Sequence, residues 1–122
     1  MVYTSTCILP VPPKPVLWVG TSLDDLRALP AAARRELGFD LRRVQVGLLP
    51  RDWKTMPSIG SGVMEVRVRL GGAFRMIFVA KFTEGVYVLH VFQKRTRRTS
   101  TLDVTVARAR LALVQRARKE RA

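Results

Sequence analysis

Apolar and polar residues alternate with a period of two through the centre of the chain, a pattern typical of β-strands, whose successive side chains point to opposite faces. Three runs carry this pattern and are predicted as consecutive strands: about Val63–Leu70, Ala73–Phe82 and Val86–Phe92. Gly71-Gly72 predicts a tight hairpin between the first two runs, and Glu84-Gly85 turns the chain before the third. The third run is apolar on both sides, which predicts a central strand covered on both faces.

Helical periodicity predicts two helices before these strands, after a short strand at about Pro15–Val19. The first helix is short and covers about Leu23–Leu29. The second is expected to run from about Pro30 toward Val46 and to stop at Gly47, because proline is tolerated at the first helical position and glycine is common just after the last. Its sheet-facing residues are expected to be Leu37, Leu41 and Val44.

A final helix is predicted near the C-terminal end, with Thr99, Ser100 or Thr101 as its cap and Asp103 in its first turn. Its apolar stripe is expected to consist of Leu102, Val106, Ala109 and Leu113. Two further segments are expected to lack regular structure: Leu48–Gly60 and Gln93–Ser100.

One domain is expected over residues 14–122, because a chain of 122 residues suits a single domain. Residues 1–13 are expected to form an irregular extension, since their prolines cannot donate to a β-ladder. Cys7 is the only cysteine, which excludes a disulfide framework and favours a reducing cytoplasm. No apolar run reaches the roughly 18–20 residues that a membrane-spanning helix requires.

Positive charge is in large excess, with 22 Lys and Arg against 9 Asp and Glu and a net charge of +13. Such a balance indicates a polyanionic partner, meaning nucleic acid or an anionic membrane surface. It does not bear on the fold.

The charged residues of the first two strands share one face of the predicted sheet. Glu65, Arg67 and Arg69 alternate along the first strand, and Arg75 interrupts an otherwise apolar second strand that reaches Lys81 on the same side. We expect helices to cover the opposite face and this face to hold an anion, because guanidinium groups fit phosphate oxygens bidentately. The alternative is an ordinary solvated face on which Glu65 pairs with one arginine.

Other candidate residues lie near this face. His90 is the only histidine and could act as a general acid or base, although an imidazole in an apolar strand is more often part of the core. Trp53 and Lys54 share a loop and could contact a base, or the tryptophan could simply pin the loop to the core. A basic cluster follows the third strand and consists of Lys94, Arg95, Arg97 and Arg98.

Several catalytic signatures are absent from the sequence. There is no glycine-rich phosphate-binding loop, no G-x-S-x-G motif and no metal-ligand spacing, so neither a metal nor another cofactor is expected. The groups that remain for catalysis are Arg, Lys and one His. They suit cleavage of RNA through its own 2′-OH, in which a base removes the proton, cations stabilise the phosphorane and an acid protonates the leaving 5′-oxygen.

The chain contains a series of segments that together resemble the RelE/ParE toxin superfamily, and more closely its phage-derived, HigB-like branch. These segments lie in order between about Lys14 and Leu113, and a final Ala/Arg-rich helix follows them. They read KPVLWVGTSLDDLRALP, VQVGLLPRDWKTMPSIGSGVMEVRVR, FRMIFVAKF and VYVLHVFQKRTRRTS. The most specific parts are D-W-K followed by G-x-G-V-x-E-x-R, and F-Q-K-R-T.

The resemblance implies a small RelE-like fold of the α+β class, with a mainly antiparallel sheet, two N-terminal helices and a C-terminal helix. It also implies the toxin of a type II toxin–antitoxin system, a metal-independent endoribonuclease that cuts mRNA on the ribosome and is neutralised by a cognate helix-turn-helix antitoxin. The candidate catalytic residues are then Arg75, Lys81, His90, Lys94 and Arg95. The candidate RNA-binding residues are Lys54, Arg67, Arg69, Arg97 and Arg98.

Two of these roles are constrained by chemistry. Arg67 and Arg69 stand where lysine is frequent in the family, and an arginine cannot act as a general base at neutral pH. The same fold also supports non-catalytic functions, so a ParE-like inhibitor of DNA gyrase and a nucleic-acid-binding protein without catalysis are the alternatives.

Overall fold

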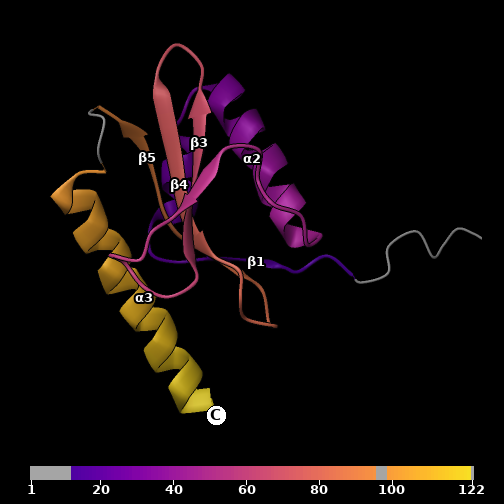
Figure 1. The fold of residues 1–122 in the computed structure, drawn as a ribbon, viewed down its shortest axis with the longest axis vertical. Coiled ribbons are helices and arrows are strands. Elements are labelled where there is room, and N and C mark those ends of the chain that lie inside the picture. Colours follow the sequence, from indigo (N-terminus) through magenta and orange to yellow (C-terminus); the bar gives the residue numbers. More distant parts are fainter. Residues whose placement is uncertain (1–11, 96–98, 122) are drawn as a thin grey trace, which may run out of the picture.

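The computed structural model describes residues 12–95 and 99–121, which form an α+β fold around one five-stranded sheet (Figure 1). The strand order is β1-β5-β4-β3-β2; β1 pairs with β5 in parallel and the other pairs are antiparallel. The expected fold class is therefore confirmed. The strands are β1 (Val16–Trp18), β2 (Trp53–Thr55), β3 (Val63–Arg69), β4 (Ala73–Val79) and β5 (Val86–Lys94). The helices are α1 (Ser22–Arg27), α2 (Ala31–Gln45) and α3 (Thr101–Arg121).

Helices cover both faces of the sheet, with α2 and α3 on opposite sides (Figure 1). The expected residues of α2, namely Leu37, Leu41 and Val44, are buried against one face. On the other face α3 packs against Val63, Ile77 and Val79. The expectation that this second face is open and basic is therefore wrong over the part that α3 covers. Within the described residues, no helix is both long and apolar enough to cross a membrane.

The helix α3 is rotated relative to the prediction. Its buried residues are Ala107, Leu111 and Val114, whereas two members of the predicted stripe, Leu102 and Leu113, are 72% and 51% exposed. Both stripes have helical spacing and apolar side chains, so periodicity alone does not choose between them. The choice is made by contacts with residues far away in the sequence.

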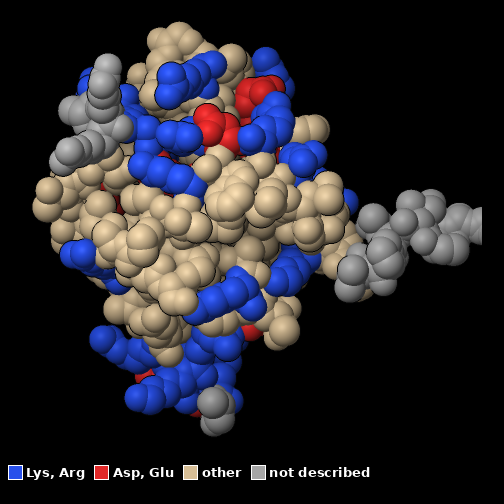
Figure 2. Space-filling model, in the orientation of Figure 1, with Lys and Arg blue, Asp and Glu red and all other residues tan. Residues whose placement is uncertain are grey.

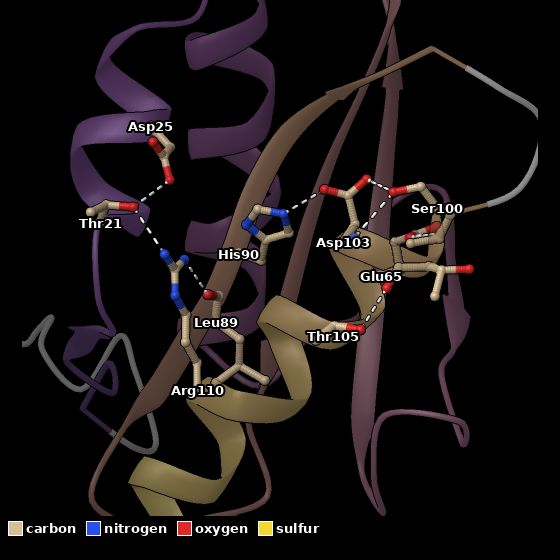
Figure 3. Close-up of polar contacts among 11 residues, drawn as sticks. Thr21, Asp25, Glu65, Leu89, His90, Ser100, Asp103, Thr105 and Arg110 are labelled. Atoms are coloured by element: carbon tan, nitrogen blue, oxygen red, sulfur yellow. Dashed lines mark hydrogen bonds and ion pairs between the residues drawn. The ribbon is translucent and has the colours of Figure 1, made fainter.

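Arg110 makes the contacts that fix this rotation (Figure 3). Its Nη1 donates to the carbonyl oxygen of Leu89 at 2.9 Å, and its Nη2 donates to Oγ1 of Thr21 at 2.9 Å. Further along α3, Arg118 pairs with Glu84 and lies 3.8 Å from the centroid of the Phe82 ring.

A β-bulge in β5 changes which side chains share a face. Ile77 pairs with His90 and Phe78 pairs with Val88, so Leu89 is an extra residue in the ladder. Val86 and Val88 consequently face α2, while His90, Phe92 and Lys94 lie on the α3 side. The strict period of two predicted for this run is therefore wrong for the strand as a whole, because the bulge adds one residue and reverses the faces beyond it.

Three element boundaries also differ from the prediction. The predicted loop Leu48–Gly60 contains β2, which pairs with β3 through Trp53↔Val66 and Lys54↔Glu65. β5 continues to Lys94, so the expected linker starts later, and β4 ends at Val79. The predicted Gly71-Gly72 turn is confirmed, with Gly71 at a φ of 67° that few other residues adopt.

Candidate functional site

A buried carboxylate lies at the centre of the basic face. Glu65 on β3 is 0% exposed and forms an ion pair with Nη1 of Arg75 on the neighbouring strand β4. Its Oε2 accepts a hydrogen bond from Oγ1 of Thr99 at 2.6 Å, and its Oε1 lies 3.8 Å from Nζ of Lys54. Lys54 is opposite Glu65 in the β2–β3 register, and cross-strand partners point to the same side of a sheet.

Lys94 joins this group from the end of β5. It is 8% exposed, and its Nζ has no hydrogen-bond partner among the described residues. Burial lowers the pKa of Lys94 below its ordinary value, and the positive charges of Arg75, Lys54 and Arg67 lower it further, while Glu65 raises it. Lys94 therefore gives up its proton more readily than a solvated lysine.

The two arginines of the group keep part of their hydrogen-bonding capacity unused. Nη2 of Arg67 pairs with Oδ1 of Asp52 at 2.8 Å, and Arg75 is held by Glu65. The Nε atoms of Arg67 and Arg75 are buried and have no partner among residues 12–95 and 99–121. A buried donor without a partner is costly, so these N–H groups are well suited to an anionic ligand.

We call Lys54, Glu65, Arg67, Arg75 and Lys94 the cationic cluster. It places four positive side chains around one carboxylate, on the antiparallel strands β2, β3, β4 and β5. Figure 2 shows Lys and Arg side chains, with acidic side chains between them, at the end of the molecule that carries the β3–β4 hairpin, and further Lys and Arg side chains toward the other end. This charge balance suits the binding of a phosphate.

His90 belongs to a separate network that attaches α3 to the sheet (Figure 3). Its Nε2 lies 2.7 Å from Oδ1 of Asp103, and Oγ of Ser100 donates to Oδ2 of the same carboxylate at 2.6 Å. Ser100 also accepts the backbone N–H of Asp103 at 3.1 Å, which confirms the predicted cap of α3. The imidazole stacks on the Phe92 ring with 4.7 Å between centroids, so His90 is largely built into the packing.

The remaining predicted site residues lie outside the cationic cluster. Lys81 is exposed and comes six residues after Arg75, about 20 Å further in an extended chain. Arg69 is exposed near the tip of β3, where it lines a cleft of about 280 Å³ together with Arg67 and Arg51. Arg95 is exposed immediately after β5. Arg97 and Arg98 lie outside the described residues.

Two residues, Glu65 and Asp52, make more contacts in the site than the sequence predicts. Glu65 was predicted only as a partner for one arginine, although it contacts the side chains of Arg75, Thr99 and Lys54. Glu65 alternates with Arg67 on the basic face, and this position among cations was the sequence signal that its carboxylate contacts several side chains. Asp52, which pairs with Arg67, begins the D-W-K motif, but the sequence predicts no role for it because it lies in a segment predicted to be a loop.

The fold and the cationic cluster define a small α+β protein with a group of positive side chains on one face of its sheet. Residues 24–112 match the family described as "Phage derived protein Gp49-like (DUF891)". This match covers more than half of the chain, and the protein therefore belongs to that family, a RelE/HigB-like family of toxins from toxin–antitoxin systems. Membership implies an antitoxin partner. No curated protein matches the chain.

Proposed function

We propose that this protein is a metal-independent endoribonuclease that cuts mRNA on the ribosome and so inhibits translation, acting in the cytoplasm as a type II toxin. The observation that carries the proposal is the cationic cluster, in which buried donors of Arg75 and Arg67 have no partner among the described residues and lie beside a lysine whose pKa is lowered. The partners of the protein in this proposal are ribosome-bound mRNA and a helix-turn-helix antitoxin. Residues 14–122 act as one domain.

Lys94 is the proposed proton-transfer group. In its neutral form its Nζ takes the proton of the RNA 2′-OH, and the resulting 2′-oxygen attacks the adjacent phosphorus. The bond from phosphorus to the 5′-oxygen then breaks, that oxygen takes a proton from solvent water as it leaves, and protonated Lys94 returns its proton to solvent. The products are a 2′,3′-cyclic phosphate and a free 5′-OH. His90 is the second candidate for the base, although its Nε2 is engaged by Asp103.

Arg75 is proposed to stabilise the charge of the phosphorane, since guanidinium donors match phosphate oxygens and a buried site strengthens their effect. Glu65 holds the Arg75 side chain in place before the substrate arrives. Lys54 and Arg67 are proposed to hold phosphates at the cluster. Lys81, Arg69, Arg95, Arg97 and Arg98 are proposed to contact RNA further along its backbone.

The test is pulsed expression of the wild type and of Arg75→Ala in a bacterial host, with mapping of new mRNA 5′ ends and measurement of translation. Arg42→Ala is the matched control, because it removes the same charge from an exposed position on α2. We expect in-frame cleavages within translated messages that are lost in Arg75→Ala and kept in Arg42→Ala. Growth arrest with intact mRNA and induced DNA damage would instead establish a ParE-like gyrase inhibitor. Soluble protein without any arrest would indicate a nucleic-acid-binding protein without catalysis.

A further inference from the structure

The helix α3 presents a second apolar stripe on the side away from the sheet. It consists of the residues that periodicity predicted as the packing face: Leu102, Val106, Ala109 and Leu113. Leu102 is 72% exposed and Leu113 is 51% exposed, Ala109 is exposed, and Val106 is half-buried. We call this set the outer stripe.

The spacing of the outer stripe matches a known mode of helix pairing. Its members are separated by four, three and four residues, which is the spacing of the a and d positions in a two-stranded coiled coil. Between its outermost leucines the stripe extends over about 16 Å of helix. The opposite side of α3 already fills the core with Ala107, Leu111 and Val114, so the domain does not need the outer stripe for its own packing. The stripe is therefore shaped to receive another helix.

The charges on α3 indicate which charged residues a partner helix would carry. The helix contains six Lys and Arg against two acidic residues, and Figure 2 shows basic side chains covering its C-terminal end. Arg116 and Lys119 are exposed and form no ion pair with any other described residue. A second copy of the chain would bring the same charges, and a net charge of +13, against this surface. A helix with acidic flanks avoids that repulsion and pairs with the free cations.

We propose that the outer stripe is the docking surface for an acidic amphipathic helix of the antitoxin. This inference rests on the proposed function, which supplies the antitoxin. The stripe begins beside the site, because Leu102 lies between Ser100 and Asp103, which form the cap of α3, and the preceding Thr99 contacts Glu65. A helix bound there lies next to Thr99, which contacts the cationic cluster through Glu65.

The binding test uses the full chain and a synthetic helical peptide of about three heptads, with leucine at the a and d positions and glutamate at the flanking positions. The same peptide with lysine in place of glutamate is the charge control. We expect the glutamate peptide to bind, and the Leu102→Gln/Leu113→Gln double variant to weaken binding by about tenfold or more. The matched control is Leu48→Gln/Leu49→Gln, which alters leucines that are 52% and 54% exposed but lie away from α3. This control should bind like the wild type.

Three results would overturn the docking proposal. They are equal binding of the lysine peptide, loss of binding in the Leu48→Gln/Leu49→Gln control instead of the stripe variant, and failure of the wild type to bind the glutamate peptide. Sedimentation that shows a wild-type dimer, abolished by the stripe variant, would assign the surface to a second copy instead.

A cellular test separates this inference from the proposed function. The wild type and the stripe variant are expressed with and without the cognate antitoxin. We expect both to cleave mRNA when expressed alone and only the wild type to be neutralised. If both are neutralised equally, the docking proposal fails and the proposed function stands. If the wild type cleaves no mRNA alone, the proposed function fails, while the peptide experiment still decides whether the stripe binds an acidic helix.

Discussion

Glu65 and Arg75 form an ion pair on adjacent strands in which the carboxylate side chain is 0% exposed and the guanidinium side chain is 6% exposed. The negative charge of Glu65 does not neutralise all the positive charge near it. Lys94, Lys54 and Arg67 lie close enough to interact electrostatically with one another beside this pair. Glu65 thus allows several cations to lie close together, and the remaining positive charge is available for a ligand.

Glu65→Gln should destabilise the fold and change the pH dependence of cleavage. Removing one member of a buried ion pair costs about 3 kcal/mol, because it leaves a buried charge without compensation. Since Glu65 raises the pKa of Lys94, its loss should lower that pKa further and move the ascending limb of the pH–rate profile, which reports deprotonation of Lys94, to lower pH. Urea unfolding and single-turnover cleavage across pH measure the two effects. A variant with lower stability and an unmoved pH profile would limit Glu65 to a structural role.

Lys94→Met should reduce cleavage by about a hundredfold and stabilise the protein at neutral pH. The pKa of Lys94 is lowered on folding, so protonation of this side chain opposes the folded state at low pH, and stability rises between the folded pKa and the ordinary value of 10.5. Removing the buried charge should raise the free energy of unfolding at pH 7 by about 1 kcal/mol. The urea midpoint checks this, and the wild type should approach the stability of the variant as pH rises.

Lys94→Arg separates proton transfer from simple charge. Arginine keeps the positive charge but stays protonated throughout the accessible pH range. We expect a loss of cleavage of about a hundredfold, similar to that in Lys94→Met. Retention of most of the activity in Lys94→Arg, measured with purified ribosomes, would show that Lys94 acts only through its charge.

The rotation of α3 can be tested with a pair of leucines two positions apart. Leu111→Ala removes a side chain that is 4% exposed and should cost about 3 kcal/mol through the cavity that it leaves. Leu113→Ala removes one that is 51% exposed and should cost less than about 1 kcal/mol. Urea unfolding of both variants gives the comparison, and the reverse order would contradict the packing described above.

Removing the cap of α3 should lower the stability of the fold by less than removing the Leu111 side chain does. Ser100→Ala removes the acceptor of the Asp103 N–H and one partner of its carboxylate, which should cost about 1 kcal/mol. Thr105→Ala is the control, since the hydroxyl of this exposed threonine hydrogen-bonds only to the Thr101 carbonyl of its own helix among the described residues. Thermal unfolding should show a lower Tm for Ser100→Ala than for Thr105→Ala.

Local patterns in the sequence determined the elements of this protein. The alternation in 63–92, the Gly71-Gly72 turn and the Ser100 cap predicted strands, a hairpin and a helix start that the structure confirms. These features depend on residues a few positions apart, which the sequence displays directly. The excess of Lys and Arg and the place of Arg75 in an apolar strand were likewise visible there.

Tertiary contacts decided which side chains meet. The bulge at Leu89 moves His90 and Lys94 to the face of Arg75, and Arg110 binds the Leu89 carbonyl and thereby sets which stripe of α3 is buried. No short-range pattern encodes either choice, because a bulge shifts the alternation by one residue without altering its composition and both stripes of α3 have helical spacing. The cationic cluster and the exposed outer stripe are therefore products of the folded chain, formed by residues brought together from β2, β3, β4, β5 and α3.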